Sequence, residues 1–506
     1  MKKWSSFVPF AKTLCLITLL APLTTLDAQQ VSYKMTTDIP ASITTPDAVE
    51  TSLGTLRFFD GFPDDATVQR VYDNIDFQRG VQAFLTALPV AVFHAMRAGY
   101  RTIGPDNQTV LITESLMDSR TLYYGANTET MYTLVWLNSK EGPLVIELPP
   151  NVLGIINDFW GRYVADLGKA GQDKGKGGRY LLLPPGYTGS VPDGYFAVHS
   201  RTYGNTCLIR SFIENGDLQP AIKNIKQHFR IYALAQVSDP PEITFVDISG
   251  KPFSSIAVND ASFFDNVASV IQEEPLEAVE PEVRGLLASI GIQKGESFAP
   301  DNRMKGILAE SAAVGNATAR SILFSSRDPD AFYYPNSAWQ TGWIGGYDFS
   351  PGGVLNPDAR TLLFYLGWGV SPAMTVKIVG LGSQYAIAFR DAAGEYLDGG
   401  KTYRLHLPAG IPAKDFWSVQ VHDSQTRSLL QTDQQYPSCS SLKKDLIVNP
   451  DSSVDIFFGP KPPFGTEANW IQTIRGKGWY IGLRLYGPLE PWFDKTWKPG
   501  EIELVK

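Results

Sequence analysis

Short strand-like stretches, each closed by turn residues, constrain the fold of this chain more than any other feature. Residues 144–148 read Leu-Val-Ile-Glu-Leu and stop at two prolines, and residues 179–183 read Arg-Tyr-Leu-Leu-Leu and also stop at two prolines. In residues 417–423 and 479–486, large apolar side chains recur at alternate positions. A period of two places alternate residues on one face of a sheet, and proline ends a sheet ladder. These stretches predict β-sandwiches rather than a helical bundle.

Apolar residues recur at helical spacing in two other parts of the chain. Residues 64–100 predict one long helix, and a helical signal returns several times between residues 216 and 327. The predicted fold class is therefore mainly β with a helical middle segment, or α+β. We expect an amino-terminal β-domain with a leading helix at 60–215, a helical connecting segment at 216–327 and a carboxy-terminal β-domain at 328–506.

The first 28 residues have the features of an export signal. Lys2 and Lys3 form a positive start, Leu14–Leu23 is apolar, and Ala28 ends a plausible cleavage site. The apolar stretch is shorter than the ~20 residues that a bilayer-spanning helix needs, although an N-terminal anchor is the alternative interpretation. We expect residues 1–28 to be a signal peptide, the mature protein to be periplasmic or secreted, and no membrane-spanning segment to remain.

Composition narrows the classes of partner. The 506 residues include 44 Lys+Arg against 52 Asp+Glu, a net charge of −8, and no basic cluster that would indicate a nucleic-acid partner.

After the export signal the chain contains two cysteines, Cys207 and Cys439, so we expect that disulfides do not hold the fold together. Cys207 lies in a strand-like stretch and is expected to be an inert core thiol, although pairing with Cys439 stays open.

Several standard catalytic motifs are absent from the sequence. The five histidines never have the spacing of a zinc site, and no Gly-x-Ser-x-Gly nucleophile turn occurs. The glycine-rich residues 168–178 lack the Gly-x-x-x-x-Gly-Lys-Ser/Thr spacing of a phosphate-binding loop. We therefore expect no cofactor and assign no metal-binding residues, although a requirement for a divalent ion stays open.

Polar residues in aromatic surroundings are the remaining candidates for a site. Eight of the eleven tryptophans lie between residues 339 and 497. Carboxylates can divide acid and base roles, and aromatic side chains can bind ring faces, although the same residues also form turns and cores. The candidate catalytic residues are Asp158 and Asp166. The candidate substrate-binding residues are Tyr124, Asn127, Trp160, Trp417, His422, Asn469, Trp470 and Arg484.

Motifs in both halves resemble two families of unknown function. Residues 124–132, 142–149 and 178–185 resemble domain of unknown function 1254, and residues 397–403, 416–419, 469–471 and 483–488 resemble domain 1214. The resemblance implies an exported bacterial protein with an immunoglobulin-like amino-terminal β-sandwich and a jelly-roll-like carboxy-terminal one. His422-Asp423 departs from the Tyr-Asp pair that usually follows the Phe-Trp strand in this family.

Three hypotheses about function follow from these features. The leading one is a hydrolase acting on a carbohydrate-containing or other ring-bearing substrate, so that the partner is a small molecule or a glycan. The second is a non-catalytic periplasmic or surface binding or assembly module, for which a homo-oligomer is an open alternative. The third is a small-molecule lyase or isomerase.

Overall fold

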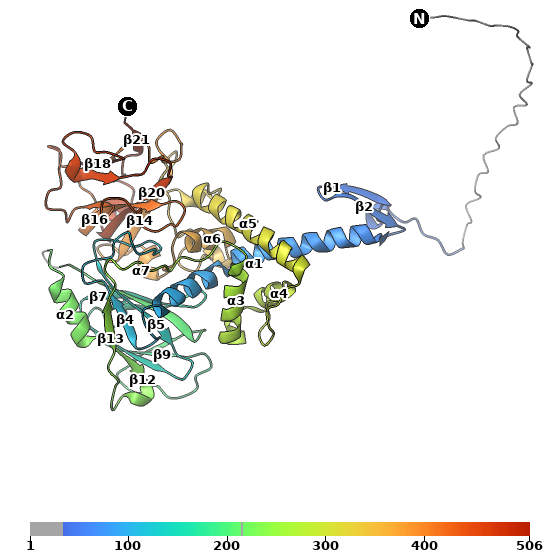
Figure 1. Cartoon of the computed structure of the whole chain (residues 1–506), viewed down its shortest axis with the longest axis horizontal. Helices are drawn as coiled ribbons and strands as arrows, with labels where there is room; N and C mark the ends of the chain where they lie inside the picture. Colours follow the sequence, from blue (N-terminus) through green and yellow to red (C-terminus); the bar gives the residue numbers. More distant parts are fainter. Residues whose placement is uncertain (1–33, 214–215, 506) are drawn as a thin grey trace, which may run out of the picture. The chain divides into compact units, whose positions relative to one another are not determined.

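The computed structural model describes residues 34–213 and 216–505 (Figure 1). The predicted signal peptide, residues 1–28, lies outside the described residues. The chain divides into two compact units, Met1–Arg70 and Val71–Lys506.

The first unit contains one small antiparallel sheet. A 3₁₀ turn at Ala41–Ile43 precedes strands β1 (Ala48–Thr51), β2 (Gly54–Phe59) and β3 (Phe62–Pro63), which pair in that order. Helix α1 (Asp65–Arg101) begins at the end of this unit and continues in the second, as the helical spacing of residues 64–100 predicted. By length and composition α1 could cross a membrane, but 67% of its most apolar window is buried, as in a core helix.

The first sandwich of the second unit is built from two sheets. One has the order β10 (Phe196–His199), β9 (Gly178–Leu183), β6 (Leu144–Leu148) and β12 (Arg230–Ala233). The other has the order β13 (Thr244–Asp247), β4 (Thr109–Ile112), β5 (Met131–Asn138), β11 (Gly204–Ser211), β7 (Val152–Asp158) and β8 (Tyr163–Gly168). Alternate residues of both sheets, among them Ile146, Leu182, Val135 and Ile209, form one buried core.

The second sandwich is also built from two sheets with a shared apolar core. One sheet has the order β14 (Ser383–Ala388), β20 (Trp479–Pro488), β16 (Ala413–Asp423) and β17 (Ser438–Ser440). The facing sheet has the order β19 (Trp470–Gln472), β18 (Val454–Gly459), β15 (Tyr403–Leu407) and β21 (Ile502–Leu504). Their shared core includes Leu405, Ile456, Val419 and Leu483.

Helices cover the outer faces of the two sandwiches. In the described part of the chain, five helices lie between the two β-regions in sequence: α3 (Ser262–Glu273), α4 (Pro281–Ser289), α5 (Asn302–Phe324), α6 (Pro357–Leu366) and α7 (Pro372–Thr375). In contrast, α2 (Gln219–His228) and α8 (Glu490–Phe493) pack into the cores of the first and second sandwich. A third core joins α1, α3, α5 and α6 to Leu208 of β11 and Tyr480 of β20. Strands β11 and β20 are therefore buried on both faces.

The described residues thus form a mixed α+β structure with five sheets and eight α-helices, and its second unit has a sandwich arrangement. This confirms the predicted fold class. Cys207 and Cys439 are both free and lie in different sandwich cores. Burial raises the pKa of each thiol to about 12, so both are unreactive at neutral pH.

Leu483→Ala should lower the free energy of unfolding by about 2–5 kcal/mol, because it opens a cavity between the sheets of the second sandwich. Leu483 is fully buried, whereas Val448 is 53% exposed. Chemical denaturation of Leu483→Ala beside a Val448→Ala control measures the difference. Equal midpoints for the two variants would contradict this packing.

Candidate functional site

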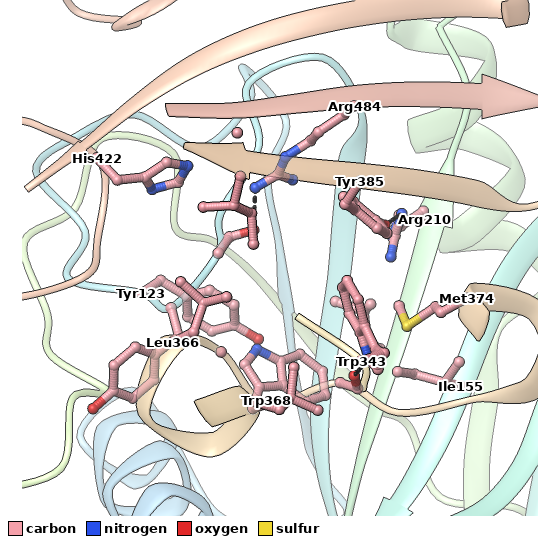
Figure 2. A pocket seen from close by; sticks show the side chains of 18 of the residues that line it. Tyr123, Ile155, Arg210, Trp343, Leu366, Trp368, Met374, Tyr385, His422 and Arg484 are labelled. Atoms are coloured by element: carbon pink, nitrogen blue, oxygen red, sulfur yellow. Dashed lines mark hydrogen bonds between the residues drawn. The ribbon is translucent and has the colours of Figure 1, made fainter. Parts of the chain in front are cut away.

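A cavity lies where the outer faces of the two sandwiches meet the helical layer. It encloses about 780 Å³ of empty space, part of it open to solvent. Its walls come from β5, β7 and β11 of the first sandwich and from β14, β16 and β20 of the second, with α6 and the residues after it closing one side. Figure 2 shows the Arg484 guanidinium pointing into this space, with Trp343 and Trp368 on the opposite side. We call it the central cavity.

Strand registers fix the polar side chains of the central cavity. Arg484 on β20 pairs with Tyr385 on β14, and Arg210 on β11 pairs with Tyr132 on β5. Alternate residues of β20 enter the apolar core, so Arg484 projects from the other face. The two guanidiniums thus come from different sandwiches and line one cavity.

Both arginines are held by backbone oxygens or side-chain hydroxyls. Arg484 donates from Nη2 to the backbone oxygens of Gly125 (2.8 Å) and Ala126 (3.0 Å). Arg210 donates from Nη1 to Tyr385 Oη (3.1 Å) and Ser383 Oγ (3.3 Å). Among the described residues, no carboxylate forms an ion pair with either guanidinium.

The charge of the central cavity is positive. None of the described residues that line it is Asp or Glu. Burial acts to lower the pKa of Arg210 and of Arg484, but the neighbouring tyrosines reverse this, and the net pKa of each arginine is raised. Both therefore stay protonated. Glu129 interacts electrostatically with Arg484, but it lies outside the lining, burial raises its pKa, and its carboxylate accepts hydrogen bonds from Thr128 and Gln420.

Aromatic rings form much of the remaining wall. Trp343 packs against Tyr385 at 5.0 Å between ring centroids, and Trp368 meets Tyr123 edge to face at 6.1 Å. The Trp343 indole donates to the backbone oxygen of Gly369, which fixes the orientation of its ring. Such a wall suits a flat apolar group.

His422 contributes a neutral imidazole. Burial, with a further contribution from Arg484, lowers its pKa to about 3. The ring stacks on Tyr480 at 5.0 Å, and Nδ1 has no hydrogen-bond partner among the described residues. At neutral pH this side chain can exchange hydrogen bonds with a ligand but carries no charge.

Of the residues that the sequence singled out, the central cavity brings together Tyr124, His422 and Arg484. Asn127 lies just behind it: its Nδ2 donates to Tyr132 Oη at 2.9 Å, and its Oδ1 accepts from the backbone of Glu129 and Thr130. Asn127 therefore positions a cavity residue.

The candidates at the end of β7 and on the loop after it are engaged in local contacts. Asp158 forms an ion pair with Arg162 Nε at 2.6 Å and accepts from the backbone nitrogens of Trp160 and Arg162. Trp160 is buried in the helical core, and its indole nitrogen has no partner among the described residues. Neither Asp158 nor Trp160 lines the central cavity.

Three further candidates lie within the second sandwich. Trp417 is buried in the core between its sheets. Asn469 donates from Nδ2 to the backbone oxygens of Ile447 and Asp455, and its Oδ1 accepts from Ile447 N. The Trp470 indole donates to Gly459 O at 2.9 Å.

Asp166 lines a smaller cavity that adjoins the central one. The two cavities share Arg210, Ile155, Leu208 and Met374 in their linings. Asp166 Oδ1 is buried without a hydrogen-bond partner among the described residues. Burial raises the pKa of Asp166 to about 6, more than hydrogen bonds from Ser371 and Ala373 lower it.

Sequence reasoning missed Arg210, Tyr385, Trp343 and Trp368. Arg210 and Tyr385 stand on strands that the sequence did predict, at alternating positions that an ordinary sandwich exposes to solvent. A sequence pattern could have revealed them: a polar or charged residue on a strand whose other residues are mostly apolar or aromatic. No group of three His, Cys, Asp or Glu side chains in the described residues is placed to hold a metal ion.

Comparison with protein families agrees with this architecture. Residues 107–233 match the family described as "Protein of unknown function (DUF1254)", and residues 382–490 match "Protein of unknown function (DUF1214)". The chain is thus an α+β protein with one region that matches DUF1254, followed by one that matches DUF1214. Its central cavity is lined by residues of both regions, for example Arg210 and Arg484.

One of the matching solved structures shares this fold. The VPA0106 protein from Vibrio parahaemolyticus matches with a TM-score of 0.53 at 18% identity, over 85% of this chain and 100% of that chain. A putative uncharacterized protein from Burkholderia cenocepacia matches over 86% of this chain and 96% of that chain, at 12% identity and a TM-score of 0.38. Comparison with curated proteins found no match.

Asp166→Asn should stabilise the protein at neutral pH and leave its stability unchanged below about pH 4. The folded-state pKa of about 6 lies above the ordinary value of 3.8, so folding favours the protonated form. The wild type then loses stability as the pH rises between these values, by at most about 3 kcal/mol, whereas asparagine cannot ionise. Melting temperatures of both proteins from pH 4 to 8 measure this. A difference that does not change with pH would contradict the raised pKa.

Proposed function

We propose that the central cavity binds a small, ring-bearing organic anion whose carboxylate lies between Arg484 and Arg210. The observation that carries this proposal is the pair of buried guanidiniums without a carboxylate ion pair. Guanidinium groups recognise carboxylates through two parallel hydrogen bonds, and an uncompensated buried charge is costly. An anionic ligand would supply the missing countercharge.

The aromatic wall of the cavity supports the proposal that the ligand carries a ring. Trp343 and Trp368 lie across the cavity from Arg484, so a ring attached to the carboxylate would contact their faces or edges (Figure 2). An aryl carboxylic acid has this combination of one charged end and one flat apolar end.

The charge of the cavity bears on the hydrolase hypothesis. Hydrolysis of glycosides commonly uses a pair of carboxylates, which the described lining does not contain. Asp158 is engaged by Arg162, and Asp166 faces the adjoining cavity. A neutral sugar would leave the two guanidiniums uncompensated, so an acidic ring compound is the better match. Export to the periplasm or cell exterior stays a prediction from residues 1–28.

Binding of 3-phenylpropionate should raise the melting temperature of the protein, and the neutral 3-phenylpropanamide should not. At 100 times its dissociation constant, a ligand stabilises the folded state by about 2.7 kcal/mol. Arg484→Met should remove this stabilisation, because the methionine lacks the donors and the charge. Arg404 pairs with Glu503 on the exposed edge of the second sandwich, so Arg404→Met is the matched control. Equal stabilisation by the acid and the amide would overturn the proposal.

Gly482→Leu should abolish binding without loss of stability. A Cβ at this position would have Arg484 Nε and His422 Nε2 as its nearest neighbours, both at 4.0 Å, so a larger side chain has room and enters the cavity. Added apolar area in the cavity should leave the melting temperature of the free protein unchanged or raised. Isothermal titration with 3-phenylpropionate measures binding. Undiminished affinity in Gly482→Leu would place the ligand elsewhere.

A further inference from the structure

The hydroxyl of Tyr385 differs from those of the other tyrosines of the central cavity in its hydrogen-bond partner. Tyr123 Oη shares a hydrogen bond with Tyr100 Oη, Tyr132 Oη accepts from Asn127, and Tyr480 Oη donates to the Arg427 backbone oxygen. Tyr124 Oη accepts from Ala257 N and Arg427 Nη2. These partners lie outside the cavity lining.

The hydroxyl of Tyr385 is instead held from within the cavity wall. Its Oη accepts from Arg210 Nη1 at 3.1 Å, and Arg484 Cζ lies 5.6 Å from the centre of its ring. Tyr385 stands between the two guanidiniums that we assign to the carboxylate of the ligand, and its ring packs on Trp343.

The charges around Tyr385 favour its ionised form. The groups that face it are Arg210 from β11, Arg484 and Tyr486 from β20, and Tyr132 from β5. Burial alone would raise the pKa of Tyr385, but the two arginines outweigh burial and hold it below its ordinary value. Burial raises the pKa of Tyr123, Tyr132 and Tyr480. Its place beside the two guanidiniums thus makes Tyr385 a better candidate for a base than Tyr123, Tyr132 or Tyr480.

We propose that Tyr385 is a catalytic acid–base residue that moves a proton on the carbon next to a carbonyl group of the bound acid. This inference rests on the proposed anion site and assigns a reaction class to it. It selects, from the hypotheses raised by the sequence, the small-molecule isomerase or lyase.

The step balances without any further reactant. The phenolate oxygen of Tyr385 forms an O–H bond with the proton, the C–H bond of the ligand breaks, and its electron pair enters the carbonyl to form an enolate. Arg210 and Arg484 stabilise the negative charge that develops beside them. Return of the proton to the opposite face or to another carbon completes an isomerisation, and departure of a leaving group with its bonding electron pair from the neighbouring carbon completes an elimination.

Phenylpyruvate is a probe of this step, because its methylene carbon lies next to a ketone and its carboxylate and ring match the cavity. In D₂O the wild-type protein should speed the exchange of the methylene hydrogens about 10²–10⁴-fold over the same buffer without protein. Proton NMR follows the loss of the methylene signal. Tyr385→Phe should return the rate to the background, while its affinity for 3-phenylpropionate stays within about twofold, because the ring still packs on Trp343 and Ser383 Oγ still accepts from Arg210. Tyr403→Phe, in the core of the second sandwich, is the control that keeps the wild-type rate.

The outcomes separate the two proposals. Binding of 3-phenylpropionate with no faster exchange, or with faster exchange that survives in Tyr385→Phe, overturns the role of Tyr385 and leaves the anion site standing. No binding of either acid overturns both. A second readout does not need a ligand: the near-ultraviolet tyrosinate absorbance of the wild type should titrate at lower pH than that of Tyr385→Phe. Identical titrations would contradict the acid–base role.

Discussion

Two buried guanidiniums, those of Arg210 and Arg484, are the constraint on which the arrangement of the central cavity depends. Removing a charged group from water costs several kcal/mol, and backbone oxygens or tyrosine hydroxyls offset only part of that cost. The backbone oxygens of Gly125 and Ala126 are directed at Arg484, and Tyr385 and Ser383 at Arg210. The region around the cavity is therefore organised to hold positive charge, which explains why an anionic ligand is its natural complement.

The fold produces this arrangement because β11 and β20 are covered on both faces. In an ordinary two-layer sandwich, one face of each sheet meets solvent. Here the helical layer covers the outer faces, so the residues on them are enclosed. Gly482 leaves open space beside Arg484, and Trp343 and Trp368 close the opposite side. Two sandwiches, each with an ordinary apolar core, thus form a polar cavity where their outer faces meet.

The sequence predicted the elements of the fold better than the site. Proline-terminated strands such as 144–148 and the spacing of the helix at 64–100 depend on local physics, and both correspond to observed elements. Tyr124, His422 and Arg484 were identified because polar groups in aromatic surroundings are unusual. Arg210 and Tyr385 were not identified, because alternation along a strand does not reveal that a second layer covers its polar face. The partners of Asp158 and Asn469 depend on the folded loops around them.

The central claim is that the carboxylate of a ring-bearing acid lies between the two arginines. A crystal structure of the protein with 3-(4-bromophenyl)propionate tests this directly, because anomalous scattering locates the bromine independently of the model. We predict the carboxylate within hydrogen-bonding distance of both Arg210 and Arg484, and the bromine beside Trp343 and Trp368. A bromine peak outside the central cavity, or a cavity that stays empty while the compound occupies another site, would contradict the account.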